Sequence, residues 1–181
     1  ELSIRTIGRA MPMVSAWGST ETSPLATDCH FQAQRSGNIG VPILSQRPMA
    51  AGGVYVLELS SYQIDLTHSL ACDVAALINL SPDHLDRYNG YEGYVESKAR
   101  LFAMQTAKQH AVFGAGDPDT HRIYQRVLSE RPDLKCHLAQ TRGLEGQADW
   151  PSLQGAHNLQ NAAVAINIVE ALGLQERQWR P

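Results

Sequence analysis

The chain is 181 residues long, 43% of them are hydrophobic, and its formal net charge is −3. This length suits one domain, or one domain and part of another, with enough apolar side chains for a sizeable core. The weak negative charge excludes a basic surface for nucleic acid or for a membrane, and no apolar run approaches the ~20 residues of a transmembrane helix. The first residues lack the pattern of a signal peptide, and the missing initial methionine predicts a fragment.

The cysteines are odd in number, far apart, and form no CxxC pair; they are Cys29, Cys72 and Cys136. This pattern disfavours a disulfide framework or a zinc site and predicts reduced thiols in a cytoplasmic protein.

Residues 1–36 are rich in Gly, Ser, Thr and Pro and show little periodicity, which predicts turns and at most short strands. From residue 54 onwards, short β-prone runs alternate with longer helical ones. The predicted strands cover residues 54–59, 74–80, 110–114 and 135–138. The predicted helices cover residues 91–104, 119–130 and 157–172. This alternation predicts an α/β fold with a mostly parallel sheet flanked by helices, in which ligands bind beyond the carboxyl ends of the strands.

Acidic side chains occur in or after two of the predicted strands. Glu58 falls inside the first, where a carboxylate is costly unless it is paired or binds a metal. At a strand end it would suit magnesium, which takes oxygen ligands, whereas on an edge strand it would simply face water. The loop 79–87 follows the second strand and holds Asp83, His84, Asp86 and Arg87. It is either a polar turn in which Asp83 caps a helix or part of a site at the functional edge of the sheet.

Lys98 lies on the apolar stripe of the predicted helix 91–104, four residues after Tyr94 and three before Leu101. Either its amine snorkels out to water, or it is buried for a functional reason. Burial lowers the pKa of a lysine, and a neutral amine reacts with carbon dioxide to give a carbamate.

The start of the last predicted helix and a glycine-rich segment give weaker signals. Asn158 and Asn161 share a helix face and could contact a base or a phosphate near the positive end of the helix, unless Asn158 is only the N-cap. Residues 37–40 read Gly-Asn-Ile-Gly. The sequence contains three lysines and none follows a glycine, so a phosphate-binding GxxxxGK(S/T) loop is missing.

Taken in order, several segments resemble the central ATPase domain of the Mur ligases. They are residues 37–40 (GNIG), 58–63 (ELSSYQ), 83–88 (DHLDRY), 98–100 (KAR) and 157–161 (HNLQN). The resemblance covers about residues 37–174 and is nearest to the D-glutamate-adding members. It implies an incomplete α/β domain of this type at 37–181, preceded by an irregular segment at 1–36.

The same resemblance implies ATP and Mg2+ as cofactors. Glu58 would bind one magnesium, and His84 and a carbamylated Lys98 would hold a second, which makes these three the expected catalytic residues. Asn158 and Asn161 would contact ATP near its base.

The reaction implied is the ligation of D-glutamate to UDP-N-acetylmuramoyl-L-alanine through an acyl phosphate, in the synthesis of peptidoglycan by a cytoplasmic monomer. Asn38 and Ser60 would line the site for the muramoyl-alanine substrate. Because the phosphate loop and the family's N-terminal and C-terminal domains are missing, we expect this chain to be inactive by itself.

Residues 8–42, and above all 17–24 (WGSTETSP), show a second resemblance, to AMP-forming acyl-CoA synthetases, in which Thr20 and Glu21 would face ATP and magnesium. This predicts a junction between two unrelated coding segments near the GNIG segment. Three functions stay open: a carboxylate–amine ligase, a non-catalytic module that binds a metal or a nucleotide, and a remnant of an acyl-CoA ligase.

Overall fold

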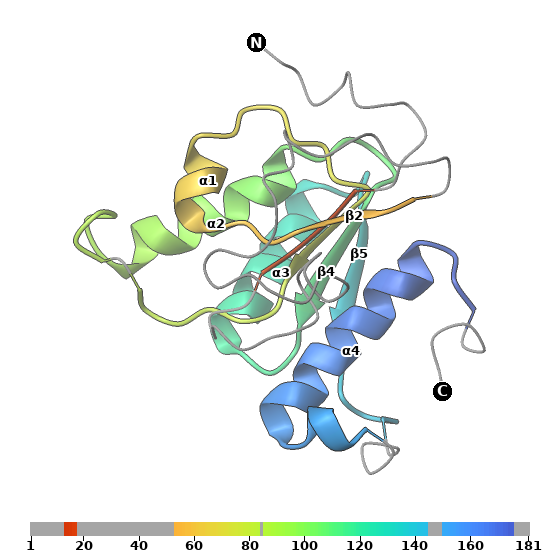
Figure 1. The fold of residues 1–181 in the computed structure, drawn as a ribbon. Helices are drawn as coiled ribbons and strands as arrows, with labels where there is room; N and C mark the ends of the chain where they lie inside the picture. The colour runs from red at the N-terminus through yellow and green to blue at the C-terminus, as the bar shows by residue number, and fades with distance from the viewer. Residues whose placement is uncertain (1–12, 18–52, 84, 145–149, 176–181) are drawn as a thin grey trace.

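The computed structural model of the chain describes residues 13–17, 53–83, 85–144 and 150–175, the first of these ranges by its backbone alone. Within these residues one parallel sheet is formed by β1 (Met13–Trp17), β2 (Tyr55–Leu57), β3 (Val74–Leu77), β4 (His110–Gly114) and β5 (Lys135–Ala139) (Figure 1). The helices are α1 (Ser61–Asp65), α2 (Tyr91–Ala103), α3 (Pro118–Glu130) and α4 (Ala156–Ala171), with a 3-10 turn, η5 (Pro151–Leu153), before α4. None of these helices is long and apolar enough to cross a lipid bilayer.

The strand order is β2-β1-β3-β4-β5, so the first strand lies between two strands that come later in the chain. Val14 pairs in register with Val56 on one side and with Val74 on the other. The chain therefore leaves β1 for one edge of the sheet and returns past it to build the other side. The predicted boundary at residue 36 stays a prediction, because residues 18–52 lie outside the described part of the chain.

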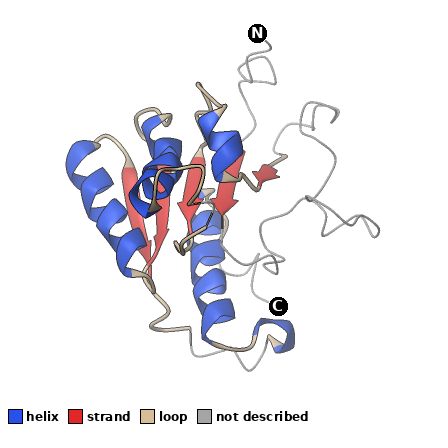
Figure 2. Ribbon diagram, turned by 90° about the vertical axis from the view of Figure 1, so that its left-hand side faces the viewer, coloured by secondary structure: helices blue, strands red, loops and turns tan. Residues whose placement is uncertain are grey.

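Helices cover both faces of the sheet (Figures 1 and 2). Along β3 every residue is buried, as is typical of a parallel strand packed on two sides. Ala75 and Leu77 join the cluster beneath α1, α2 and α3. Val74 and Ala76 join the opposite cluster, which α4 covers with Ala163, Val164 and Ile168. The predicted α/β fold with a parallel sheet flanked by helices is confirmed.

The local sequence explains where the helices begin. Asp117 caps α3 by accepting a hydrogen bond from Thr120 N, and Pro118 occupies the first turn. Ser60 and Gln63 form a capping box at the start of α1. The helix α1 has five residues and the predictions missed it, although the Ser-x-x-Gln pattern was its signal.

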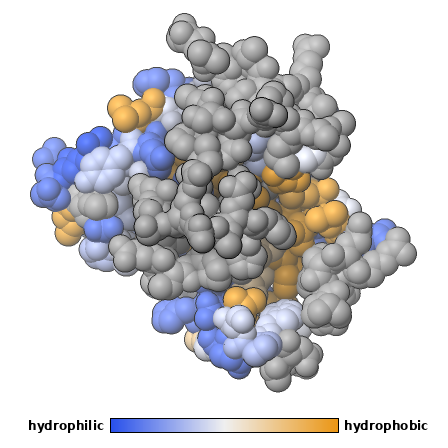
Figure 3. All heavy atoms as spheres, viewed as in Figure 1, coloured by the Kyte–Doolittle hydropathy of each residue, from blue (hydrophilic) through white to orange (hydrophobic). Residues whose placement is uncertain are grey.

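The surface is uneven in character. On the face of the molecule seen in Figure 3, apolar side chains gather in one area, on the α4 side of the sheet. Large apolar side chains are also exposed elsewhere, with Leu66 after α1 the most exposed at 77%.

Candidate functional site

The carboxyl ends of the strands bring together side chains from separate segments. The strand order reverses at β1, and in open parallel sheets ligands bind beyond the carboxyl ends of the strands at such a point. Glu58 directly follows β2, and Asp83 lies in the loop after β3, so the two carboxylates flank β1. The prediction that Glu58 lies inside a strand is wrong, because β2 ends at Leu57 and leaves the half-buried Glu58 just beyond it.

Lys98 is buried, with 2% of its surface exposed, which decides between the two predicted alternatives in favour of burial. Its Nζ lies 5.3 Å from the centroid of the Tyr94 ring. Burial lowers the pKa of Lys98 from 10.5 to about 6, against the opposing effect of the negative charges of Asp83, Glu58 and Asp65. We refer to Glu58, Asp83 and Lys98 together as the Lys98 centre.

Glu58 and Lys98 affect each other's ionisation. Burial raises the pKa of Glu58, and the positive charge of Lys98 partly offsets that rise. At neutral pH the amine is therefore largely unprotonated, and it lies within electrostatic reach of Glu58. A neutral buried amine can take up carbon dioxide, and the resulting carbamate would add oxygen donors beside Glu58, of the kind that magnesium prefers.

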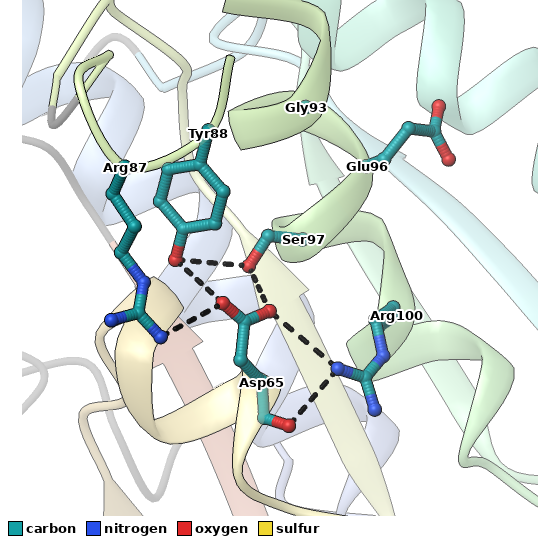
Figure 4. Close-up of a pocket in the computed structure, with 7 residues that line it drawn as sticks. All are labelled: Asp65, Arg87, Tyr88, Gly93, Glu96, Ser97 and Arg100. Carbon is teal, nitrogen blue, oxygen red and sulfur yellow. Dashed lines mark hydrogen bonds and ion pairs between the residues drawn. The ribbon is translucent and has the colours of Figure 1, made fainter. Parts of the chain in front are cut away.

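A network around Asp65, the last residue of α1, includes Ser97, which precedes Lys98 on α2 (Figure 4). Its carboxylate accepts hydrogen bonds from Tyr88 Oη at 2.8 Å and Ser97 Oγ at 2.7 Å, and pairs with Arg87 and Arg100. These groups line an open pocket of about 500 Å3. Asp65 was not among the predicted site residues, because no local pattern distinguishes it.

The remaining predicted residues fall into two groups. Asn38 and His84 lie outside the described residues. Ser60 is described: its Oγ accepts a hydrogen bond from Gln63 N and donates one to Gln63 Oε1, so it caps α1. A contact between Ser60 and a substrate stays a prediction.

Asn158 and Asn161 lie in the first turns of α4. This end of the helix packs at the carboxyl ends of β5, where Gln160 Nε2 donates to Ala139 O at 3.0 Å, and of β4, where a Cβ on Gly114 would come 3.3 Å from the same nitrogen. The N-cap of α4 is Gly155, so the alternative in which Asn158 is the cap is wrong. Asn158 Nδ2 donates to Gln154 O instead. Their contact with ATP stays a prediction.

Asp117 ties two loops of this edge together. Its Oδ2 accepts hydrogen bonds from Leu80 N at 3.1 Å and from Thr120 N at 2.8 Å, which joins the segment after β3 to the start of α3. The alternative in which Asp83 caps a helix is also wrong, because α2 begins after Gly90.

Among the described residues, no three His, Cys, Asp or Glu side chains are close enough to hold a metal ion. This finding does not test the predicted metal site of Glu58, His84 and Lys98, because Lys98 is a lysine and His84 lies outside the described residues. The acidic and neutral-amine character of the Lys98 centre fits a magnesium site completed by a carbamate.

A parallel α/β sheet with a half-buried carboxylate just beyond one strand has the doubly wound architecture in which ligands such as nucleotides bind where the strand order reverses. The chain matches the Mur ligase middle domain over residues 11–134 and belongs to that family. The match begins ahead of β1, within the segment that was predicted to be irregular.

Curated relatives agree with this family. The chain is 64% identical over 148 residues to a UDP-N-acetylmuramoylalanine–D-glutamate ligase of Novosphingobium aromaticivorans, which covers 82% of this chain and 33% of the relative. It is 41% identical over 176 residues to a protein of the same name from Zymomonas mobilis, covering 93% of this chain and 39% of the relative. The chain thus spans about a third of the length of these relatives.

Solved structures agree on the fold. MurF from Acinetobacter baumannii superposes with a TM-score of 0.60 at 18% identity, over 92% of this chain and 44% of that one. A UDP-N-acetylmuramoyl-L-alanyl-D-glutamate–2,6-diaminopimelate ligase gives a TM-score of 0.62 at 20% identity over the same shares. None of the proteins described here is an acyl-CoA synthetase, so the second predicted resemblance of residues 8–42 gains no support.

Proposed function

We propose that this chain is the metal-binding part of a ligase that joins D-glutamate to UDP-N-acetylmuramoyl-L-alanine with ATP and Mg2+, in the cytoplasm and as a monomer. The observation that carries the proposal is the burial of the Lys98 amine within electrostatic reach of Glu58, which lies just beyond β2. The names of the relatives support the choice of substrates.

In this proposal each residue has a defined task. Glu58 binds one magnesium, while His84 and the carbamate of Lys98 hold a second. Asn38 and Ser60 line the site for the muramoyl-alanine substrate, and Asn158 and Asn161 contact ATP near its base. Magnesium, when bound, neutralises the charge that develops on the transferred phosphoryl group.

The chain's own residues set up the metal site before any ligand arrives. Burial keeps Lys98 unprotonated at neutral pH, with its pKa near 6, so it can react with carbon dioxide. The carbamate replaces a neutral group by an anionic one, and this extra negative charge favours a divalent cation over an empty site.

We propose that the isolated chain does not turn over. Gly18 directly follows β1, where a phosphate loop would begin at the reversal point, yet residues 18–36 contain no lysine. Without that lysine, positioning of the phosphates is lost, and positioning provides much of the rate in phosphoryl transfer.

Phosphate release tests the activity. The assay combines ATP, magnesium and UDP-N-acetylmuramoyl-L-alanine, with and without D-glutamate, for wild type, Lys98→Ala and the exposed-lysine control Lys108→Ala. We expect no release above background in any of them. Glutamate-dependent release that is lost only in Lys98→Ala would mean a working ligase and would refute the proposed inactivity.

Carbon-13 NMR under labelled carbon dioxide tests the role of Lys98 itself. We expect one carbamate signal in wild type and in Lys108→Ala, none in Lys98→Ala, and a change in that signal on adding magnesium. A spectrum of wild type without the signal would refute the role proposed for Lys98.

The missing lysine favours a second function, a module that binds magnesium or nucleotide without catalysis. Calorimetric titration with magnesium separates it from an inert fragment. Magnesium binding that needs carbon dioxide, with no phosphate release, would support the module. An absence of magnesium binding both with and without carbon dioxide would exclude it.

A further inference from the structure

Asp65 stands where three segments that carry site residues meet (Figure 4). Asp65 ends α1, the helix that follows Glu58 and Ser60. The turn formed by residues 85–89 follows Asp83, and α2 carries Lys98. Side chains of both the turn and α2 reach the Asp65 carboxylate.

Each carboxylate oxygen of Asp65 has two partners. Oδ2 accepts from Tyr88 Oη at 2.8 Å and lies 3.6 Å from Arg87 Nη2. Oδ1 accepts from Ser97 Oγ at 2.7 Å and lies 3.5 Å from Arg100 Nη1. Arg100 Nη1 also donates to the Asp65 backbone oxygen at 3.1 Å. Such charge-assisted contacts are stronger than hydrogen bonds between neutral groups.

The contact with Ser97 bears directly on Lys98. Ser97 is 5% exposed and precedes Lys98 on α2, and its Oγ also lies 3.3 Å from Ser61 O at the start of α1. Because successive side chains on a helix are about 100° apart, fixing Ser97 fixes the rotation of α2 and the direction in which Lys98 points.

The turn is held just as closely. A Cβ on Gly93, in the first turn of α2, would come 2.1 Å from Tyr88 O, so the turn and the helix touch through backbone. Both arginines that line the pocket pair with Asp65, which favours a positioning role for this network over the capture of an anion.

We propose that Asp65 is a positioning residue for the Lys98 centre: it fastens α1 and the turn 85–89 to α2 and so keeps the Lys98 amine enclosed beside Glu58. The importance of this for the reaction rests on the proposed function. The enclosure of Lys98 can be measured without it.

Reductive methylation followed by mass spectrometry measures that enclosure in the full chain. The sequence has three lysines, and the exposed Lys108 and Lys135 are internal references for the buried Lys98. Measuring the Lys98 rate over a range of pH separates the reactivity of the unprotonated amine, which reports access, from the fraction of the amine that is unprotonated. For Asp65→Asn we expect the Lys98 rate, relative to the references, to rise at least about tenfold, as the loss of a charge-assisted acceptor implies for local opening.

Two further variants identify the cause. Glu96→Gln makes the same carboxylate-to-amide change beside the same pocket, but Glu96 pairs with Arg126 of α3, so we expect the wild-type Lys98 rate. Tyr88→Phe leaves the Asp65 charge in place and removes one donor, so positioning predicts a smaller rise of the same kind, while a purely electrostatic effect of Asp65 predicts none.

Thermal unfolding of each variant shows whether a rise in Lys98 labelling reflects the whole chain opening. Equal Lys98 rates in Asp65→Asn and Glu96→Gln would overturn the inference. It would also be overturned if, in both variants, the rise in the Lys98 rate were in proportion to the fall in the unfolding temperature, since opening of the whole chain would then explain the labelling. If the carbamate signal is absent from wild type, the proposed function fails, and the labelling rates still decide the role of Asp65. If the signal is present in wild type, we expect Asp65→Asn to reduce it at matched carbon dioxide pressure.

Discussion

The buried amine of Lys98 makes the free energy of unfolding depend on pH. Its pKa is about 6 in the folded chain and ordinarily 10.5, so between these values the unfolded chain binds more protons. The destabilisation is fully present below about pH 6 and disappears as pH rises toward 10.5, with a slope of at most about 1.4 kcal/mol per pH unit. Urea unfolding in carbon dioxide-free buffer should show this slope in wild type and lose it in Lys98→Met. Parallel curves for the two proteins would contradict it.

A pair of histidines gives a second pH dependence, in a lower range. His110 Nδ1 lies 2.9 Å from His137 Nε2 on the adjacent strands β4 and β5. Burial lowers the pKa of both histidines. The charges of His137 and Lys135 lower the pKa of His110 further. The charge of Lys135 also lowers the pKa of His137, whereas the charge of Glu170 raises it. The unfolded chain is therefore protonated first, and stability is lost as pH falls below the ordinary value of 6.5.

The change His137→Gln should remove much of this acid sensitivity and leave the slope above neutral pH, which belongs to Lys98. Thermal unfolding between about pH 5 and 7 measures it. An unchanged acid slope in the variant would show that other groups cause it.

At the scale of single residues, the sequence predicted alternatives for a side chain, and only the packing of the fold decides between them. Helical spacing placed Lys98 on an apolar stripe but left snorkelling open, and packing decided for burial. Asp65 was beyond prediction, because its partners Tyr88, Ser97 and Arg100 lie 23, 32 and 35 residues further along the chain. Contacts at such separations leave no mark on local periodicity.

At the scale of elements, Asp117 carries more than a helix cap. Besides capping α3 it accepts a hydrogen bond from Leu80 N, from the segment after β3. Asp117→Ala should therefore lower the free energy of unfolding by about 2–3 kcal/mol, above the ~1 kcal/mol of an ordinary cap.

Asp117→Asn serves as the matched change, since the amide oxygen can still cap α3. We expect it to cost about half as much or less in urea unfolding. An alanine variant that loses no more than about 1 kcal/mol would show that the bond to Leu80 contributes little.

The regular elements were predictable because each carries its own pattern. The helices α2, α3 and α4 begin and end within one residue of the predicted ranges. The first strand was expected to run over 54–59, yet β2 is Tyr55–Leu57, because the apolar run continues through Leu59 after pairing with β1 has ended. The short β1 and α1 had too few residues for a periodic signal.

At the scale of the whole molecule, the order of the strands was the least predictable feature. An alternating pattern predicts a parallel sheet, but it does not say that β1 lies between β2 and β3. That placement sets the carboxyl end of β1 between those of β2 and β3, which Glu58 and Asp83 follow, at the reversal point where a phosphate-binding loop belongs. The segment with the weakest sequence pattern thus supplies an internal strand of the sheet, β1.

This placement predicts that nucleotide binding can be gained by changing the segment after β1. The combined change Ser23→Gly, Pro24→Lys and Leu25→Thr completes the GxxxxGK(S/T) pattern that starts at Gly18. Backbone amides and a lysine in this pattern bind phosphate oxygens, and β1, which leads into the segment, ends between β2 and β3. Calorimetric titration with ATP and magnesium should then show an affinity at least about tenfold higher than that of the matched variant with Pro24→Met, a gain of about 1.4 kcal/mol. Equal affinities would mean that the lysine at this position is not what the chain lacks, and the explanation offered for its inactivity would have to be given up.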